Sequence, residues 1–369
     1  MLTQEAQPFV LRMTMSKFFS QKYAMLEAYV PGEQPKDQKY IKLNTNESPF
    51  SPSPSVLKAV SEEVDKLCLY SDPECTPLVS ECAALFGISR DEVLMTNGSD
   101  EILNFAFMAF GDEASPFVFP NISYGFYPVF ARLNGIPYRE IPLKEDFTID
   151  YRDYMNVGAN VVIANPNAPT GIALPLWQIE EIVKSNPENV VVIDEAYVDF
   201  GAESAVSLIH KYANLLVTQT FSKSRSMAGA RLGFGIASKD LIRDLNTIKY
   251  STNPYNVNRM TMVAGYRALV DNDYYMDNCK KIIENRKYTE KELKRLGFEV
   301  LPSSANFLFA KSRDIEGEEL YLSLKSRGVL VRHFSKPEIK DFNRITIGTR
   351  EQMEFFITKT EEILKEKKS

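Results

Sequence analysis

Short apolar runs alternate with helical patterns between about residues 55 and 260. The runs VVIA, VVVI and LLVTQTF, at 161–164, 190–193 and 215–221, are typical of buried strands. Helical spacing occurs at 60–67, 76–87, 174–186 and 204–213, and Gly87 is placed to cap the second of these helices. Residues 91–111 fit a strand, a turn and a helix, and 229–238 a further strand. This order predicts an α/β fold, a mostly parallel central sheet flanked by helices.

The pattern changes after about residue 255. A long helical region at 257–296 precedes shorter alternations at 298–311, 328–334 and 344–348, and a last helix at 351–367. These elements predict a smaller α+β domain. We therefore expect a tail over residues 1–20 that can be disordered, a segment over 21–54 that adds to the small domain, a large domain over 55–260 and a small C-terminal α+β domain over 261–369.

The composition is that of a globular protein and narrows the class of ligand. The chain has 369 residues, of which 44% are hydrophobic and 25% charged, enough for one large or two medium domains. Its formal net charge is −6, and Lys and Arg are scattered along the sequence, which argues against a nucleic-acid surface. A small-molecule ligand is the better expectation.

Cysteine and histidine usage argues against a metal site. Three of the four cysteines are seven residues apart, which matches no common zinc pattern, and both histidines lie far along the chain. These residues are Cys68, Cys75, Cys82, Cys279, His210 and His333. We expect free thiols in a reducing cytoplasm. The N-terminus lacks the features of a secretory signal, Met13 and Met15 are alternative starts, and no segment reaches the roughly 18 apolar residues of a membrane span.

Polar residues follow three of the predicted strands. Asn165 and Asn167 come after VVIA, Asp194 after VVVI, and Lys223 after LLVTQTFS. Because the carboxyl ends of parallel strands share one edge of a sheet, where ligands bind, we expect these side chains to converge. Each also has a plainer interpretation, since a lone lysine there is usually part of a surface turn and Asp194 alone fits a helix cap or a salt bridge.

The turn Gly98-Ser99-Asp100 lies between a predicted strand and a helix. Glycine lets the backbone turn, and the first helical residues present free N–H groups to an anion, although a plain helix cap explains the turn equally well. Arg231, Thr220 and Ser222 supply the charge and the donors that a phosphate needs. The chain has neither GxxxxGK[ST] nor GxGxxG, so nucleotide-binding interpretations lose their usual support.

Pyridoxal 5′-phosphate is a cofactor that uses all of these groups. Its phosphate needs an anchor, its aldehyde forms an imine with a lysine, and its pyridine nitrogen needs a carboxylate to stay protonated. Its 3-oxygen accepts hydrogen bonds from a phenol and an amide, and Tyr197 follows Asp194 by three residues. Its ring needs an aromatic partner, for which Tyr124 in YGFY is a candidate. The sequence therefore predicts a pyridoxal-phosphate site.

Six strings occur in the order typical of one enzyme family: TNGSDE, SYGFY, NPNAPTG, DEAY, TFSKS and GARLGFG. Over about 90–350 they resemble the fold-type I, class I/II pyridoxal-phosphate aminotransferases. AYVPGEQP, KLNTNESPF, VLVRHF and FNRITIG resemble the histidinol-phosphate aminotransferases within that family, and extend the likeness to about 23–365. NES at 46–48, where NEN is more usual, and SRS after the lysine depart from the pattern, but neither touches a catalytic group.

By matching position, the resemblance implies a role for each candidate residue. Around the cofactor ring it implies Lys223 for the imine, Asp194 for the pyridine nitrogen, Asn167 and Tyr197 for the 3-oxygen, and Tyr124 for stacking. Around the phosphate it implies the backbone of Ser99 and Asp100 together with Thr220, Ser222 and Arg231. Tyr70 matches a tyrosine that reaches the cofactor phosphate of the neighbouring subunit. A homodimer is therefore implied, with dimer contacts from residues 21–54.

The resemblance also implies a substrate site that includes Asn167. Arg344 matches the arginine that binds the carboxylate of the amino donor, and Arg332 and Tyr29 match groups at the far end of the substrate. One arginine cluster can serve two substrates, because guanidinium pairs with carboxylate and phosphate alike. From the residues alone, structural ion pairs of the two arginines with nearby carboxylates, and a packing role for Tyr29, stay open.

The implied activity is ping-pong transamination, from L-histidinol phosphate to 2-oxoglutarate, which gives imidazole acetol phosphate and L-glutamate. Lys223 would act as the general base at Cα, with Asp194 and Tyr197 as its catalytic partners. An aromatic amino-acid aminotransferase and a threonine-phosphate decarboxylase share most of these motifs and stay open as alternatives. The intact Lys223 and Asp194 argue against a non-catalytic cofactor-binding module.

Overall fold

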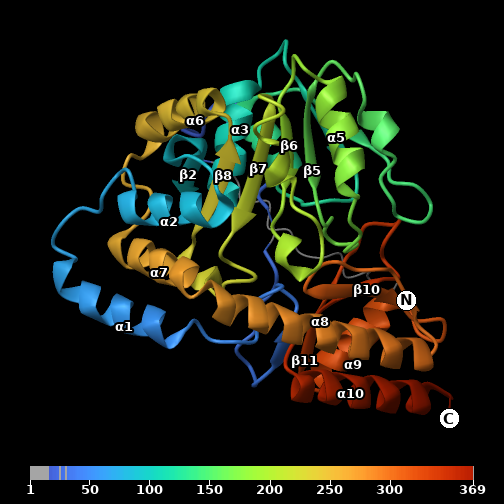
Figure 1. Cartoon of the computed structure of the whole chain (residues 1–369). Coiled ribbons are helices and arrows are strands. Elements are labelled where there is room, and N and C mark those ends of the chain that lie inside the picture. Colours follow the sequence, from blue (N-terminus) through green and yellow to red (C-terminus); the bar gives the residue numbers. More distant parts are fainter. Residues whose placement is uncertain (1–15, 25, 30, 369) are drawn as a thin grey trace.

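Two β-sheets organise the chain, and both are visible in Figure 1. The structure is a computed structural model that describes residues 16–24, 26–29 and 31–368. The larger sheet has the order β2-β8-β7-β6-β5-β3-β4, with strands β2 (Val93–Thr96), β3 (Phe117–Pro120), β4 (Tyr138–Ile141), β5 (Asn160–Ala164), β6 (Val191–Asp194), β7 (Leu215–Thr220) and β8 (Gly233–Ala237). The smaller has the order β1-β11-β12-β10-β9, with strands β1 (Ile41–Leu43), β9 (Glu299–Val300), β10 (Phe307–Lys311), β11 (Val329–His333) and β12 (Asn343–Thr346).

The larger sheet is mostly parallel, as the strand and helix pattern predicts. Strands β4, β3, β5, β6 and β7 pair in parallel, whereas β8 is antiparallel to both β7 and β2. The register sets Asp194 beside Ala164 of β5 on one side and Thr218 of β7 on the other. The carboxyl ends of these three strands therefore lie side by side at one edge.

Helices cover both faces of the larger sheet because its central strands are apolar on both. Ile193 packs in a core with residues of α2, α5 and α7, whereas Val192, its neighbour in β6, packs with residues of α3, α4 and α6. The helices are α1 (Pro54–Glu63), α2 (Thr76–Phe86), α3 (Ser99–Phe110), α4 (Tyr127–Asn134), α5 (Leu176–Ser185), α6 (Lys239–Thr252), α7 (Arg259–Val270), α8 (Asn272–Arg295), α9 (Gly317–Ser326) and α10 (Arg350–Lys368).

The smaller sheet has its own apolar core, to which α8, α9 and α10 contribute. In Figure 1, helix α8 runs across the picture below the larger sheet, and the chain ends in α10 at the bottom. Helix α7, which follows the predicted boundary near residue 260, contributes Met262 and Leu269 to the core of the larger sheet. The boundaries of the two domains stay a prediction.

The predicted helix capped by Gly87 is confirmed, with φ +66° at the glycine. Two other predicted helical segments differ from the structure. Residues 204–213 hold only a 3-10 turn, Ala205–Leu208, because the chain must reach β7 within a few residues. The long region 257–296 is two helices, α7 and α8, separated at Asp271, whose carboxylate accepts hydrogen bonds from Ser53 and Ser55. Residues 1–15 of the predicted tail, including Met13 and Met15, lie outside the described residues.

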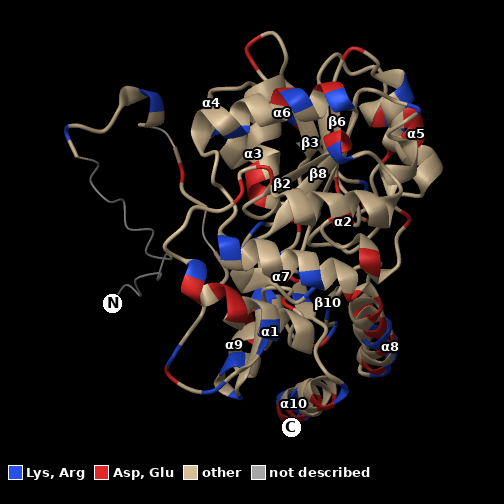
Figure 2. Ribbon diagram, turned by 60° about the vertical axis from the view of Figure 1, so that its left-hand side comes forward, with Lys and Arg blue, Asp and Glu red and all other residues tan. Residues whose placement is uncertain are grey.

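Charged side chains of both signs are mixed over the surface helices, as Figure 2 shows. This distribution agrees with the scatter of Lys and Arg along the sequence. Across the described residues, no helix is both long enough and apolar enough to cross a membrane.

Candidate active site

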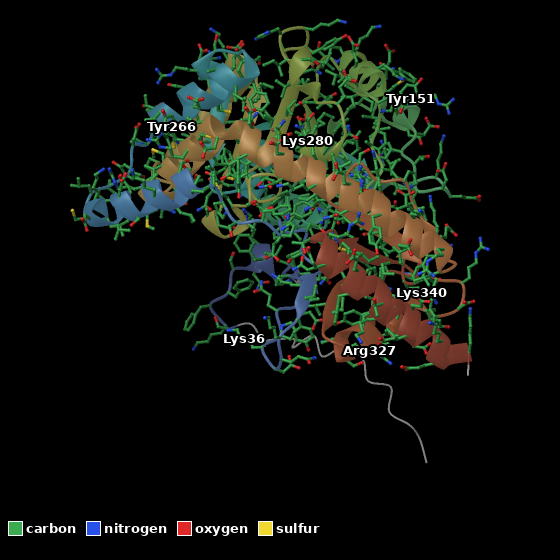
Figure 3. The ribbon with its side chains drawn as sticks, turned by 60° about the horizontal axis from the view of Figure 1, so that its bottom comes forward. Lys36, Tyr151, Tyr266, Lys280, Arg327 and Lys340 are labelled. Atoms are coloured by element: carbon green, nitrogen blue, oxygen red, sulfur yellow. The ribbon has the colours of Figure 1, made fainter. Side chains whose placement is uncertain are left out.

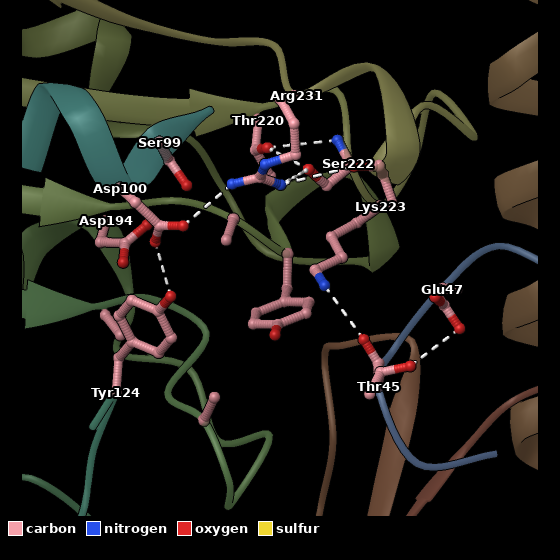
Figure 4. A pocket seen from close by; sticks show the side chains of 15 residues that line it. Thr45, Glu47, Ser99, Asp100, Tyr124, Asp194, Thr220, Ser222, Lys223 and Arg231 are labelled. Atoms are coloured by element: carbon pink, nitrogen blue, oxygen red, sulfur yellow. Dashed lines mark hydrogen bonds and ion pairs between the residues drawn. The ribbon is translucent and has the colours of Figure 1, made fainter. Parts of the chain in front are cut away.

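A cavity with an empty volume of about 880 Å³ lies at the carboxyl edge of β5, β6 and β7 (Figure 4). Its wall brings together most of the side chains that the sequence singles out for a cofactor. These are Ser99, Asp100, Tyr124, Asp194, Tyr197, Thr220, Ser222, Lys223 and Arg231. The convergence expected from the polar strand ends is therefore present in the structure for both Asp194 and Lys223.

Lys223 enters this cavity just after β7. Its Nζ donates a hydrogen bond to the carbonyl oxygen of Thr45, 3.2 Å away, and lies 5.8 Å from the centre of the Tyr197 ring. Burial, reinforced by the positive charge of Arg344, lowers the pKa of the lysine to about 8, while Glu47 opposes the shift. In the part of the chain that the structure describes, no carboxylate forms an ion pair with Lys223, so its amine is available for chemistry.

Asp194 is 4% exposed and ends β6. Its carboxylate accepts hydrogen bonds from the hydroxyls of Tyr127, at 2.9 Å, and Thr218, at 3.4 Å. Burial raises the pKa of Asp194 to about 6, although the Tyr127 bond favours the charged form. Among the described residues no cation pairs with this carboxylate, and a buried carboxylate of this kind is best stabilised by a positive partner.

The start of α3 forms one end of the cavity. Gly98 caps the helix with φ +80°, and among the described residues no side chain caps the first helical N–H groups. Arg231 lies against this turn, since a Cβ at Gly98 would be 2.6 Å from its Nη2. The Arg231 guanidinium pairs with Asp100 at 2.9 Å and approaches the Ser222 hydroxyl at 3.4 Å. Free N–H groups, hydroxyls and a guanidinium together suit a phosphate.

Two tyrosines flank the space between Lys223 and Asp194. The Tyr124 hydroxyl donates to the Asp100 carboxylate at 2.6 Å, and burial, with that carboxylate nearby, raises the pKa of Tyr124 well above its ordinary value. The Tyr197 hydroxyl accepts from the Nδ2 of Asn46 at 2.9 Å. Sequence reasoning assigned no role to Asn46, Thr45 or Tyr127. The first two lie in KLNTNESPF, and the third in YGFY, so the resemblance contained the signal.

A second cavity adjoins the first and shares Thr45, Tyr124, Ala168, Tyr197 and Lys223 with it. It has an empty volume of about 1180 Å³ and is also lined by Tyr29, Arg332 and Arg344. The four charged residues of its wall are Lys223, Arg332, Lys336 and Arg344. All of them are cations, and within the described residues the wall contains no Asp or Glu. The cavity therefore favours an anionic ligand.

Arg332 and Arg344 are directly opposite each other on the antiparallel strands β11 and β12. Their guanidinium carbons lie 5.6 and 5.7 Å from the centre of the same ring, that of Phe334. The Nη2 of Arg344 donates to the carbonyl of Asn44 at 3.0 Å, whereas its buried Nε has no hydrogen-bond partner among the residues that the structure describes. The ion pairs of these two arginines with nearby carboxylates, which the sequence left open, do not form among the described residues. Two positive charges on neighbouring strands repel each other, so this arrangement favours a bound anion.

Comparison with known proteins identifies the family. The profile of the family described as "Aminotransferase class I and II" matches residues 38–359. The chain belongs to this family. The histidinol-phosphate aminotransferase of Brachyspira hyodysenteriae is 51% identical over 353 residues, which cover 95% of this chain and 100% of the relative. That of Clostridium botulinum is 46% identical over 351 residues, which cover 95% and 99%.

Solved structures confirm the fold of this aminotransferase. The histidinol-phosphate aminotransferase of Sinorhizobium meliloti, solved in complex with pyridoxal 5′-phosphate, superposes with a TM-score of 0.87 at 22% sequence identity. The match covers 96% of this chain and 99% of that one. The fold-type I prediction is therefore confirmed, and so is the cofactor class, because class I and II aminotransferases depend on pyridoxal phosphate.

Two predicted site residues of the aminotransferase lie apart from the first cavity. The side chain of Asn167 accepts from the Ser123 hydroxyl at 2.7 Å and donates to the Ile122 carbonyl at 3.0 Å, and it does not line the first cavity, although its neighbour Ala168 does. Tyr70 is 81% exposed and stacks on Tyr255, with ring centres 4.7 Å apart. The predicted roles of these two residues stay predictions.

Proposed function

We propose that this aminotransferase is a histidinol-phosphate aminotransferase, which passes the amino group of L-histidinol phosphate to 2-oxoglutarate and gives imidazole acetol phosphate and L-glutamate. The observation that carries the substrate class is the wall of the second cavity, where cations are present and carboxylates are absent among the described residues. Arg332 and Arg344 can bind a phosphate or a carboxylate there, so one site accepts both substrates in turn. The relatives of that name at 46% and 51% identity support this choice.

The first cavity fits pyridoxal 5′-phosphate. Lys223 offers an amine without a carboxylate partner, and Asp194 offers a buried carboxylate without a cation. Arg231, with the start of α3, offers an anion site. When bound, the cofactor supplies an electron sink that makes the Cα–H bond of the amino donor acidic, and carries the amino group between substrates. The amine, the carboxylate and the anion site correspond to the aldehyde, the ring nitrogen and the phosphate of the cofactor.

In this proposal, each side chain of the cavity has a separate role. Lys223 removes the proton at Cα of the donor and returns one, and its pKa of about 8 leaves a usable share of neutral amine near neutral pH. Asp194 would hold a proton on the ring nitrogen of the bound cofactor, since a cation beside its carboxylate offsets the cost of burial. Tyr197, oriented by Asn46, would donate to the 3-oxygen, and Tyr124 would serve as the aromatic partner of the ring.

The active unit in this proposal is a homodimer in which Tyr70 reaches the cofactor phosphate of the neighbouring subunit. Its exposure and its separation from its own cavity support this role. Exposed apolar side chains surround it in the sequence, at Val64, Leu67 and Leu69. We also propose a cytoplasmic location, supported by four cysteines that are all free thiols.

The test is to add one amino donor at a time to the cofactor-loaded protein and to follow the cofactor spectrum, without any oxo acid. We expect L-histidinol phosphate to convert the cofactor to its amino form faster than L-phenylalanine. Conversion by phenylalanine alone would favour an aromatic amino-acid aminotransferase instead. Release of carbon dioxide from O-phosphothreonine, without a need for 2-oxoglutarate, would favour a threonine-phosphate decarboxylase.

A further inference from the structure

A third cation, Lys336, lines the second cavity together with Arg332 and Arg344. Its Nζ donates to the main-chain carbonyl oxygen of Asn121, 2.9 Å away. No ion pair joins Lys336 to a carboxylate among the described residues. An ammonium group has three donors, and one carbonyl engages one of them. Lys336 therefore has donors to spare at the wall of a cavity that lacks negative charge.

The two proposed substrates differ in the charge they bring to this cavity. A phosphate monoester carries close to two negative charges at neutral pH and three acceptor oxygens, whereas a carboxylate carries one charge and two. Arg332 and Arg344 alone suffice for a carboxylate, because a single guanidinium already binds it with two hydrogen bonds. The more highly charged group gains from one more cation, and a lysine acts as a compact point charge toward phosphate.

The Asn121 contact is also the plainer explanation for Lys336. Asn121 follows β3 of the larger sheet, and Lys336 follows β11 of the smaller one, so the bond ties together the parts of the chain around the two sheets. A purely structural tie would affect stability and both substrates alike. A role in substrate binding would affect the phosphate-bearing substrate alone.

We propose that Lys336 is a specificity-determining residue for the phosphate of the amino donor. It exchanges the Asn121 carbonyl for a phosphate oxygen when the donor binds, and returns to the carbonyl when 2-oxoglutarate occupies the site. This inference rests on the proposed function for the identity of the donor. It extends that proposal to a residue other than the two arginines. It also explains how one cavity binds a phosphate more tightly than a carboxylate.

The first experiment compares Lys336→Met with Lys336→Arg and with Lys340→Met in the cofactor-loaded enzyme. Lys340 is the matched control, an exposed lysine of the same segment that is labelled in Figure 3 and does not line the cavity. We expect Lys336→Met to raise the KM for histidinol phosphate about tenfold, because a charge-assisted bond is lost, with kcat and the KM for 2-oxoglutarate changed less than about twofold. Lys336→Arg should retain most of the affinity. An equal rise in both KM values, or no rise, would overturn the proposal.

The second experiment measures binding without turnover. Inorganic phosphate should raise the thermal unfolding midpoint of the cofactor-loaded wild type, and Lys336→Met should need about tenfold more phosphate for the same rise, while Lys340→Met behaves as the wild type. If histidinol phosphate proved not to be the donor, this phosphate dependence would still stand, which separates the two proposals. A wild type insensitive to phosphate, or a Lys336→Met response equal to that of the wild type, would overturn the role of Lys336.

Discussion

The hydroxyl of Tyr127 donates a hydrogen bond to Oδ2 of Asp194 over 2.9 Å, from a ring that is wholly buried. Tyr127 is the first residue of α4, and Asp194 the last of β6, so the bond joins a helix on one face of the larger sheet to the edge where the cofactor site lies. The bond favours the charged carboxylate, whereas burial disfavours it. Tyr127 is therefore a positioning residue for Asp194.

Replacing Tyr127 with Phe should weaken catalysis through Asp194. Loss of the donor raises the pKa of the carboxylate relative to the wild type, because the charged form loses a hydrogen bond typically worth about 1.5–3 kcal/mol. We expect kcat to fall by roughly tenfold near neutral pH, and the acid limb of the pH–rate profile to move to higher pH. The measurement is that profile for wild type and variant.

Tyr154→Phe is a matched control for this change. Tyr154 is as deeply buried as Tyr127, but its hydroxyl has no hydrogen-bond partner among the described residues, and it lies in the core on the other face of the sheet. Its removal should leave the pH–rate profile in place. A shift of equal size in both variants would assign the effect to general loss of packing rather than to Asp194.

Gly98→Ala should damage the phosphate site. Gly98 has φ +80° and ψ 166°, a conformation that is essentially restricted to glycine, and a Cβ there would lie 2.6 Å from Arg231. Arg231 must move, so we expect the Kd for pyridoxal phosphate to rise at least tenfold, as measured by equilibrium titration. Gly135→Ala is the control, because Gly135 also has positive φ, at +72°, but a Cβ there meets no atom within 4 Å. That variant should lose about 1 kcal/mol of stability and keep its cofactor affinity.

Much of the site could be predicted because local apolar runs reveal its strands, and the ends of parallel strands meet at one edge of the sheet. The apolar runs before Asp194 and Lys223 are strands β6 and β7, and the parallel register brings their ends together. Periodicity does not say which of two adjacent carboxylates faces the cavity. Asp194 faces Tyr127, whereas Glu195 faces the opposite way and bonds to Ser204. Asp194 was singled out by its position directly after the apolar run, and the resemblance to the family then gave it a role.

Contacts between distant parts of the chain could not be predicted from local sequence patterns. Thr45 contacts Lys223 across 178 residues of sequence, and Asn46 contacts Tyr197 across 151, so neither pair produces a local pattern. The pairing of Arg332 with Arg344 depends on the antiparallel register of β11 and β12, which no short stretch of the sequence reveals by itself. The predicted helix at 204–213 was wrong for a related reason, because the distance to the next strand decided the conformation there.

The rate at which cofactor-free enzyme takes up pyridoxal phosphate should depend on the charge of Lys223. Only the neutral amine can attack the cofactor aldehyde, and burial together with Arg344 lowers the pKa of Lys223 to about 8. The rate should therefore rise with pH and level off above about 8, rather than near the ordinary lysine value of 10.5. Stopped-flow absorbance of the cofactor measures this profile.

Arg344→Met tests the cause of that profile. Loss of the positive charge raises the pKa of Lys223, so the plateau should move to higher pH, by up to about one unit, and uptake near pH 7.5 should slow severalfold. Arg332→Met is the control, because Arg332 does not appear among the charges that act most on Lys223. An unchanged plateau in Arg344→Met would mean that burial and the other nearby charges, rather than Arg344, set the pKa of Lys223.

Co-expression of two inactive variants tests whether Tyr70 acts in the neighbouring subunit. Lys223→Ala removes the amine, and Tyr70→Ala removes the proposed contact with the cofactor phosphate of the partner, so each homodimer should have little activity. In a mixed dimer, the site with an intact Lys223 belongs to the Tyr70→Ala chain and receives Tyr70 from the other chain. Random pairing makes half of the dimers mixed, with one native site each, so we expect about a quarter of the wild-type activity.

The same mixture excludes the opposite arrangement. If Tyr70 served its own subunit, no site in any dimer would hold both residues, and co-expression would add nothing to the separate variants. Purified variants mixed without subunit exchange provide the control, since they contain the same chains but no mixed dimers. Activity that appears only after partial unfolding and refolding of that mixture would assign the gain to shared sites. The exposed position of Tyr70, which does not line the cavity of its own chain, would then be explained by the site that it completes in the partner.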